Sequence, residues 1–231
     1  RKVPMKIFPA VHYSMGGLWV DYDQMTNIPG IFAAGECDYS QHGANRLGAN
    51  SLLSAIYGGM VAGPKAIEYI DGLDKHVTDM GSELFDARVK EEQEKFEALL
   101  KMDGTENAYQ LHQELGQWMT DNVTVVRENA RLEKTDEKLQ ELLERWENIS
   151  VTDTSQWSNQ GVMFTRQLRN MIELARVITL GALNRNESRG AHYKPEFPER
   201  DDENFLKTTI ATFDKEKDEP VITYEDVDVS L

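Results

Sequence analysis

Glu36 and Arg46 lie in a glycine-rich stretch, residues 33–59, that carries the side chains best suited to chemistry. From the end of a buried strand, the Glu36 carboxylate could accept hydrogen bonds from the vicinal hydroxyls of a ligand. The alternative is that Glu36 caps a neighbouring helix or loop. Arg46 presents a planar guanidinium that suits a carboxylate bound through two parallel hydrogen bonds. Glycines in this stretch indicate sharp bends or a close approach of the backbone to another group: Gly35, Gly43, Gly48, Gly58 and Gly59.

A helix is predicted shortly after Arg46, from about Leu52 to Ile70, with Asn50 or Ser51 as its N-cap. The first turn of a helix carries unpaired N–H groups and a partial positive charge, so an electron-rich or anionic atom is expected there. The other interpretation is a surface arginine followed by a capped helix. The surrounding glycines favour the binding site over that interpretation.

One histidine precedes this stretch and another lies within it. His12 precedes Gly16 and Gly17, and it could donate to a carboxylate or act as an acid or base, although a lone histidine is more often structural. His42 lies in the glycine-rich loop, and its role stays open. Neither histidine has an acidic or cysteine companion at metal-ligand spacing. The sequence also lacks the G-x-G-x-x-G, P-loop and H-E-x-x-H motifs.

Composition narrows the class of protein. The 231 residues include 40 acidic and 25 basic side chains, a net charge of −15, which argues against a nucleic-acid partner. Cys37 is the single cysteine, so an internal disulfide is excluded and a reducing compartment is expected. The sequence contains no run of 18 apolar residues, so it predicts no membrane-spanning helix. Because the chain opens at Arg1 without a methionine, we expect a fragment or a processed product.

The elements that position these residues form an α+β fold. Residues 1–34 are predicted to be β structure, with strands at 3–11, 17–20 and 31–34, followed by the glycine-rich loop and the helix. After residues 75–81, glycine becomes rare and charge rises. Apolar stripes then predict four helices, at 82–102, 108–119, 132–146 and 161–184, and a closing strand is predicted at 221–229. The predicted domains are residues 1–80, a helical bundle at 81–185, and a tail at 186–231.

Several motifs in this order and spacing resemble the flavoprotein subunit of succinate dehydrogenase and fumarate reductase. They are HYSMGG at 12–17, AGE at 34–36, NRLGANSL at 45–52, ESRGAH at 187–192 and RDDENF at 200–205. The resemblance covers essentially the whole chain, and its details look closest to the type from Gram-positive bacteria. It implies the C-terminal segment of a Rossmann-like FAD-binding domain followed by a helical-bundle domain.

The resemblance also implies roles for individual residues. His12 and Arg46 would bind the carboxylates of succinate or fumarate, and Gly48 and Ala49 would let the backbone approach this substrate. The flavin would be bound by Glu36, through its ribityl and neighbouring hydroxyls, and by Asn50, Ser51 and Leu52, with the backbone N–H groups of Ser51 and Leu52 at the pyrimidine edge of the ring.

The implied activity is succinate oxidation by hydride transfer to flavin N5, with electrons passing to an iron–sulfur subunit, a membrane-anchor cytochrome b subunit and quinone. Such a complex lies on the inner face of the cell membrane, with this subunit in the cytoplasm. The family's glycine-rich phosphate-binding motif, the histidine that links FAD covalently, and the proton-shuttle arginine do not occur in these 231 residues. We therefore expect no catalytic residue here, and no tight FAD binding or turnover by this polypeptide alone.

Two alternatives stay open. L-aspartate oxidase shares several of these motifs, but it usually carries a different residue where Met15 stands and lacks the long acidic tail after Tyr193. The second alternative is that residues 82–231 act chiefly as a helical interaction module. Arg189 and His192 would then lie at a domain interface or near the flavin, although Arg189 and Gly190 could equally end a helix.

Overall fold

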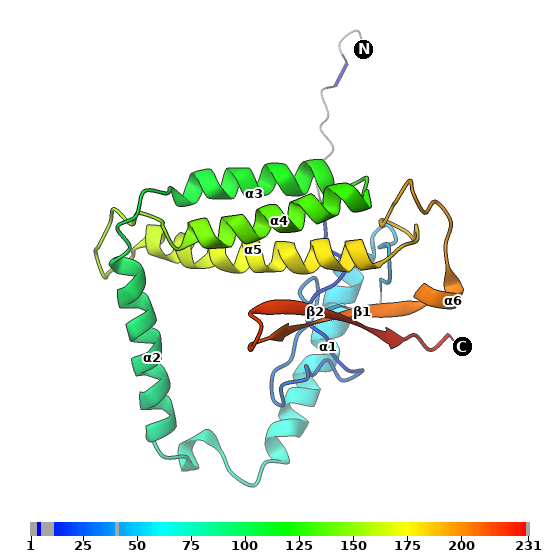
Figure 1. Ribbon diagram of the computed structural model, residues 1–231. Helices are drawn as coiled ribbons and strands as arrows, with labels where there is room; N and C mark the ends of the chain where they lie inside the picture. Colours follow the sequence, from blue (N-terminus) through cyan, green and yellow to red (C-terminus); the bar gives the residue numbers. More distant parts are fainter. Residues whose placement is uncertain (1–3, 6–11, 40–41, 230–231) are drawn as a thin grey trace. The chain divides into compact units, whose positions relative to one another are not determined.

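The computed structural model describes residues 4–5, 12–39 and 42–229. The chain divides into two compact units, Arg1–Met80 and Gly81–Leu231. Both helices and strands are present, as expected for a mixed fold (Figure 1). The strand predicted at 3–11 lies outside the described residues, apart from the two at 4–5, which form no strand.

The first unit contains irregular backbone, the helix α1 (Asn50–Asp71) and a short 3₁₀ turn at Val77–Asp79. The predictions of strands at 17–20 and 31–34 are wrong. A strand needs a neighbour that pairs along its length, whereas these segments take part only in isolated bridges: Leu18 with Asp38, Val20 with Thr26, and Met25 with Phe32.

The helix α1 begins at Asn50, and its N-cap is Ala49 rather than the predicted Asn50 or Ser51. Ala49 has a φ of 67°, in the left-handed region, and no side chain caps the first turn. A backbone turn, in which Asn50 N donates to Leu47 O at 3.1 Å, directs the chain into the helix instead. The first-turn N–H groups therefore stay available.

At Gly58, α1 packs closely on the preceding loops. Gly58 is buried, and a Cβ at this position would lie 3.0 Å from Gln24 Oε1 and 3.1 Å from the Ala34 Cβ. At these distances a side chain would push its neighbours away, so glycine permits the close approach. It holds the first half of α1 against the segment that carries Glu36.

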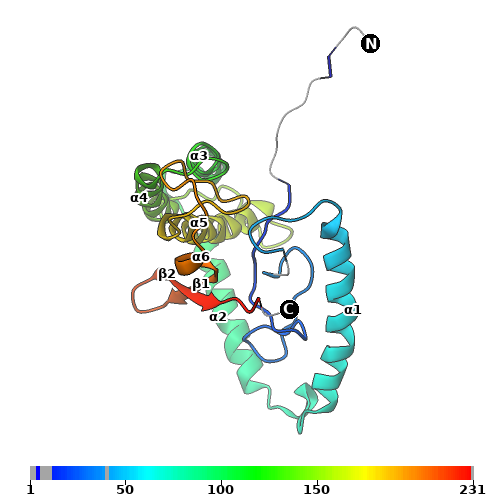
Figure 2. The ribbon, with the colours of Figure 1, turned by 90° about the vertical axis from the view of Figure 1, so that its right-hand side faces the viewer.

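The second unit contains four long helices: α2 (Glu83–Leu100), α3 (Ala108–Asn122), α4 (Asn129–Trp146) and α5 (Gln160–Asn184). The four predicted helices are confirmed, with ends shifted by a few residues. Figure 2 views α3, α4 and α5 nearly end-on, packed side by side. Their apolar stripes meet in one core, because residues three and four apart share a helix face. Fully buried members are Leu111, Leu139, Leu142, Val162, Leu168 and Ile172.

A two-stranded antiparallel sheet follows the short helix α6 (Asp202–Phe205). The strand β1 (Lys207–Asp214) pairs with β2 (Glu219–Asp226), so that Lys207 lies opposite Asp226. Both strands contact α5. The predicted closing strand is confirmed in part, because β2 overlaps 221–229, but its partner β1 was not predicted.

Candidate functional site

The candidate site lies in the first unit, where two loops meet ahead of α1. Ser14 N donates to Glu36 Oε1 at 2.8 Å, which joins the His12–Gly17 loop to the loop after Gly35. Leu18 N donates to Cys37 O at 2.8 Å, and Tyr39 N donates to Leu18 O at 2.9 Å. These bonds bring the segments 12–17 and 34–39 side by side.

Gly17 and Asp38 explain how the two loops are held. A Cβ at Gly17 would lie 2.3 Å from Cys37 O, so only glycine fits there. Asp38 is 3% exposed, and its Oδ2 accepts from Gly35 N at 3.1 Å. Glu36, between Gly35 and Asp38, stays exposed. The loop is thus fixed from inside while the Glu36 carboxylate faces outward.

Arg46 is half-buried against a tyrosine ring. Its guanidinium carbon lies 5.1 Å from the centroid of the Tyr13 ring, and its Nη1 donates to Leu47 O at 3.0 Å. Its Nε is buried and has no acceptor among the residues that the structure describes. A buried N–H without an acceptor is costly unless a ligand supplies one. Arg46 therefore has hydrogen-bonding capacity that the described protein does not use.

The other predicted site residues lie close to Arg46 in the chain. Gly48, Ala49 and Leu52 are exposed, and Ser51 is half-buried. An α-helix leaves the N–H groups of its second and third residues, here Ser51 and Leu52, without partners inside the helix. No acidic side chain lies in this first turn. The end of α1 is consequently a place where backbone N–H groups and the helix dipole favour an anionic or electron-rich ligand.

The structure does not join His12 to Arg46. His12 is exposed in the loop, and within the described ranges no hydrogen bond or ring contact links it to the other predicted site residues. Its role in substrate binding stays a prediction.

Sequence analysis missed a second group in this site. Tyr13 Oη lies 3.0 Å from His42 Nε2, and His42 Nε2 lies 3.1 Å from Ser54 Oγ. Tyr13 also has a φ of 71°, in the left-handed region that non-glycine residues rarely adopt. The sequence signal was the presence of Tyr13 and His42 in the two motif-bearing loops, but no spacing rule predicts that they meet.

A separate polar cluster lies in the second unit. Glu187 is fully buried, and it pairs with Arg185 Nη1 at 2.7 Å and with Arg189 Nε at 2.8 Å. Burial acts to raise the pKa of Glu187, but hydrogen bonds from Arg189, the Asp201 N–H and Arg185 outweigh it, so the pKa is lowered. Arg189 also pairs with Asp202 at 2.7 Å. These contacts give Arg189 a structural role within its own unit.

His192 is buried in the same cluster. Its Nδ1 lies 2.6 Å from Arg127 Nη1, and its Nε2 lies 2.9 Å from Arg185 O. Burial, together with the nearby charge of Arg127, lowers the pKa of His192 to about 4. Next to it, Lys194 is fully buried, and burial lowers its pKa to about 8. Both side chains are held by internal hydrogen bonds.

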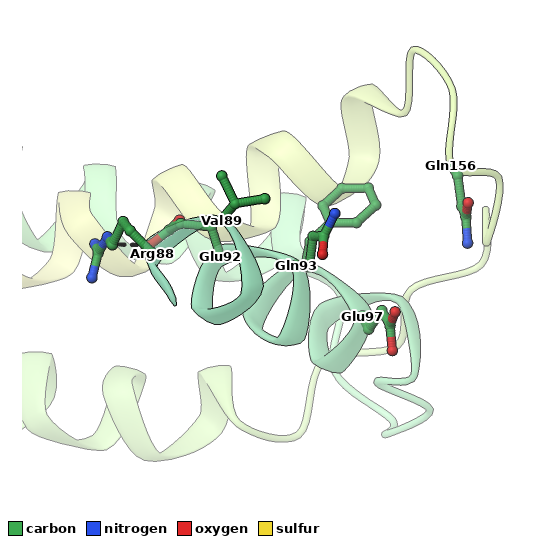
Figure 3. Close-up of a pocket in the computed structure, with 7 residues that line it drawn as sticks. Arg88, Val89, Glu92, Gln93, Glu97 and Gln156 are labelled. Atoms are coloured by element: carbon green, nitrogen blue, oxygen red, sulfur yellow. Dashed lines mark ion pairs between the residues drawn. The ribbon is translucent and has the colours of Figure 1, made fainter. Parts of the chain in front are cut away.

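The helix α2 carries a pocket of about 590 Å³ in the second unit (Figure 3). Two of its charged side chains pair with each other, since Arg88 Nη2 lies 2.8 Å from Glu92 Oε1. Glu92 also pairs with Arg166 at 2.7 Å. The pocket is lined by Arg88, Val89, Glu92, Gln93, Phe96, Glu97 and Gln156.

Over 4–5, 12–39 and 42–229, no three His, Cys, Asp or Glu side chains gather as a metal site would require. Among the helices of that part of the chain, none combines the length and the apolar character needed to cross a bilayer.

Comparison with known proteins identifies the class. Residues 1–52 match the family model of an FAD binding domain, and residues 112–231 match the model described as fumarate reductase flavoprotein C-term. The succinate dehydrogenase flavoprotein subunit of Bacillus subtilis is 70% identical over the whole chain, which covers 39% of that protein. This chain belongs to the flavoprotein-subunit family of succinate dehydrogenases and fumarate reductases.

Solved structures agree with this assignment. The quinol fumarate reductase FrdA of E. coli, determined as a point variant, is 34% identical and superposes with a TM-score of 0.90 over 100% of this chain and 39% of that one. A quinol–fumarate reductase with menaquinol molecules gives a TM-score of 0.86 at 34% identity over 95% of this chain and 38% of the other. The chain thus spans about two fifths of the length of the relatives it matches, and the L-aspartate oxidase alternative is not favoured.

Proposed function

We propose that this chain forms the substrate-facing and flavin-facing part of the catalytic subunit of a succinate dehydrogenase or fumarate reductase, which interconverts succinate and fumarate. The observation that carries the proposal is the position of the Arg46 guanidinium and its unused hydrogen-bonding capacity. Its guanidinium lies just ahead of the uncapped end of α1, with its Nε buried and without an acceptor in the described ranges. A substrate carboxylate would supply that acceptor and accept a forked pair of hydrogen bonds.

The substrate-binding roles follow from this geometry. Arg46 would orient one carboxylate of the dicarboxylate, and the exposed His12 would donate to the other end. Gly48 and Ala49 are exposed and small, so the backbone there would allow the substrate to approach the end of α1. No described residue of this set is proposed to transfer a proton to or from the substrate.

The residues present also fit an FAD. Glu36 uses one oxygen to accept from Ser14 N, so its second oxygen would accept from the ribityl and neighbouring hydroxyls. The unpaired N–H groups of Ser51 and Leu52 would donate to the pyrimidine edge of the ring. The Asn50 N–H already donates to Leu47 O, so Asn50 would contribute through its side-chain amide. FAD would supply the two-electron acceptor for the hydride that leaves succinate.

The domain assignment extends the family membership. We place residues 1–80 at the end of a Rossmann-like FAD-binding domain, 81–185 in a helical bundle domain and 186–231 in a C-terminal tail. Support comes from the FAD-binding match at 1–52 and from the helices packed within the second unit.

We also infer the partners. The subunit would dock on an iron–sulfur subunit and, through it, on a membrane-anchor cytochrome b subunit with a quinone site. It would then lie in the cytoplasm, held on the inner face of the membrane by these partners. Support comes from the solved relatives, which include a quinol–fumarate reductase with bound menaquinol.

The proposed function is tested with Arg46→Lys in a full-length flavoprotein that contains these residues. Lysine keeps the charge but loses the fork. A hydrogen bond to a charged group contributes roughly 1.5–3 kcal/mol, so we expect kcat/KM for succinate to fall about 10- to 100-fold, with the flavin content unchanged. Arg88→Lys, at an exposed position on α2, is the matched control. Kinetics like the parent's in Arg46→Lys would exclude Arg46 from the substrate site.

A further inference from the structure

Tyr13, His42 and Ser54 form a closed triangle of polar atoms beside Arg46. The Oη of Tyr13 lies 3.0 Å from His42 Nε2 and 3.4 Å from Ser54 Oγ, and the third side, from His42 Nε2 to Ser54 Oγ, is 3.1 Å. The rings of Tyr13 and His42 also meet edge to face, with centroids 5.2 Å apart. All three side chains are half-buried. The triangle joins two loops to the first turns of α1.

The protons in this triangle can be assigned. Ser54 Oγ donates to Ser51 O at 3.0 Å, which uses its single proton, so Ser54 Oγ must accept from its other neighbours. An unprotonated His42 Nε2 would then face the lone pairs of Ser54 at 3.1 Å. The tautomer with a proton on Nε2 avoids this repulsion, because His42 then donates to Ser54. The triangle is therefore anchored, through Ser54, on the first turn of α1.

The backbone at Tyr13 is strained in the same place. Its φ of 71° lies in a region that is unfavourable for a residue with a side chain, and such strain persists only where the surroundings fix it. The surroundings do so here on both sides, since the hydroxyl is held by the triangle and the next residue donates from Ser14 N to Glu36. The ring of Tyr13 consequently has one defined position.

The ring in turn supports the guanidinium. Arg46 lies over its face at 5.1 Å, the geometry of a cation–π contact. With Nη1 held by Leu47 O, this contact fixes the plane in which the remaining N–H groups of Arg46 point. We propose that Tyr13, His42 and Ser54 are positioning residues that hold the Arg46 guanidinium ready to receive a dicarboxylate. This inference rests on the proposed role of Arg46.

The first test is Tyr13→Phe in the full-length holoenzyme, which removes the hydroxyl and keeps the ring. Loss of a hydrogen bond of about 1 kcal/mol predicts that KM for succinate rises about fivefold, while kcat and flavin content change less than twofold. Tyr22→Phe, at a position 99% exposed, is the matched control. An unchanged KM in Tyr13→Phe would overturn the inference.

The second test is a comparison of two His42 variants. His42→Gln keeps an N–H donor for Ser54, and His42→Ala removes it. We expect KM to stay near the parent value in the glutamine variant and to rise as in Tyr13→Phe in the alanine variant. If His42 had a structural role alone, both variants would have a lower melting temperature without this difference in KM. Equal KM values in the two variants would refute the positioning role of Tyr13, His42 and Ser54.

A double-mutant cycle separates this inference from the proposed function. If Tyr13 acts through Arg46, adding Tyr13→Phe to Arg46→Lys changes kcat/KM by less than twofold. An equal, independent loss in both backgrounds would leave Arg46 as the substrate ligand but would refute the positioning role of Tyr13. Normal kinetics of Arg46→Lys by itself would instead refute the proposed function.

Discussion

His192 is held in one protonation state by its two partners, and this makes its effect on stability predictable. Arg127 can only donate, so Nδ1 of His192 must accept at 2.6 Å, and Nε2–H then donates to Arg185 O at 2.9 Å. A second proton on the ring would place an N–H against the guanidinium. The fold therefore requires the neutral imidazole with its proton on Nε2.

The size of the effect follows from the pKa. Burial, with the charge of Arg127, lowers the pKa of His192 from 6.5 to about 4. The unfolded chain takes up the proton first as pH falls, so the free energy of unfolding decreases between pH 6.5 and pH 4. At roughly 1.4 kcal/mol per pKa unit, the loss is about 2 kcal/mol at pH 5 and about 3 kcal/mol at pH 4.

The assay is urea unfolding of the chain at pH 7 and pH 5, with the His192→Gln variant beside the parent. Protonation of buried carboxylates such as Glu187 lowers the free energy of unfolding in acid in both proteins. The difference between the two free energies therefore isolates the contribution of His192. We expect that difference to shrink by about 2 kcal/mol from pH 7 to pH 5. His112→Gln, at an exposed site of the same unit, controls for the loss of a histidine. Parallel pH profiles for the parent and His192→Gln would refute the neutral assignment.

Two further predictions concern the same polar cluster. Glu187→Gln leaves the guanidinium groups of Arg185 and Arg189 without their buried counter-charge, so we expect the free energy of unfolding in urea to fall by about 3–5 kcal/mol. Glu91→Gln on the exposed face of α2 should leave that free energy almost unchanged. Lys194 donates to neutral oxygens of Asn129, Leu183 and Asn186, and burial lowers its pKa to about 8. The folded protein releases this proton first, so the free energy of unfolding should rise between pH 8 and pH 10, and a Lys194→Met variant that kept the same rise would contradict this.

The helices of the second unit could be predicted because their signal is local. In α4, the side chains of Leu139, Leu142 and Trp146 repeat at helical spacing, and all three are buried in the core. Caps added little to that signal, since Asn107 and Asn159 cap α3 and α5 while α1 has no side-chain cap. The ends of the helices were therefore predicted less accurately than the presence of the helices.

The strands were predicted less well because a strand is defined by its partner. Residues 17–20 and 31–34 have the apolar character of strands, but in the described structure they find single bridge partners only. The strand β1 was missed, although it pairs with β2 over its whole length. Its register depends on the turn that starts at Asp214, whose Oδ1 accepts from Glu216 N at 2.9 Å.

The sequence by itself determined which residue types are available: a glycine-rich loop with Glu36 and Arg46, a helix after it, and a helical second half. Only the tertiary structure decided which polar atoms meet. Tyr13 and His42 are 29 residues apart, and Arg127 and His192 are 65 apart, yet each pair lies within hydrogen-bond distance. Periodicity and motif spacing describe a chain over a few turns, whereas these contacts depend on how loops close, and so no local pattern specifies them.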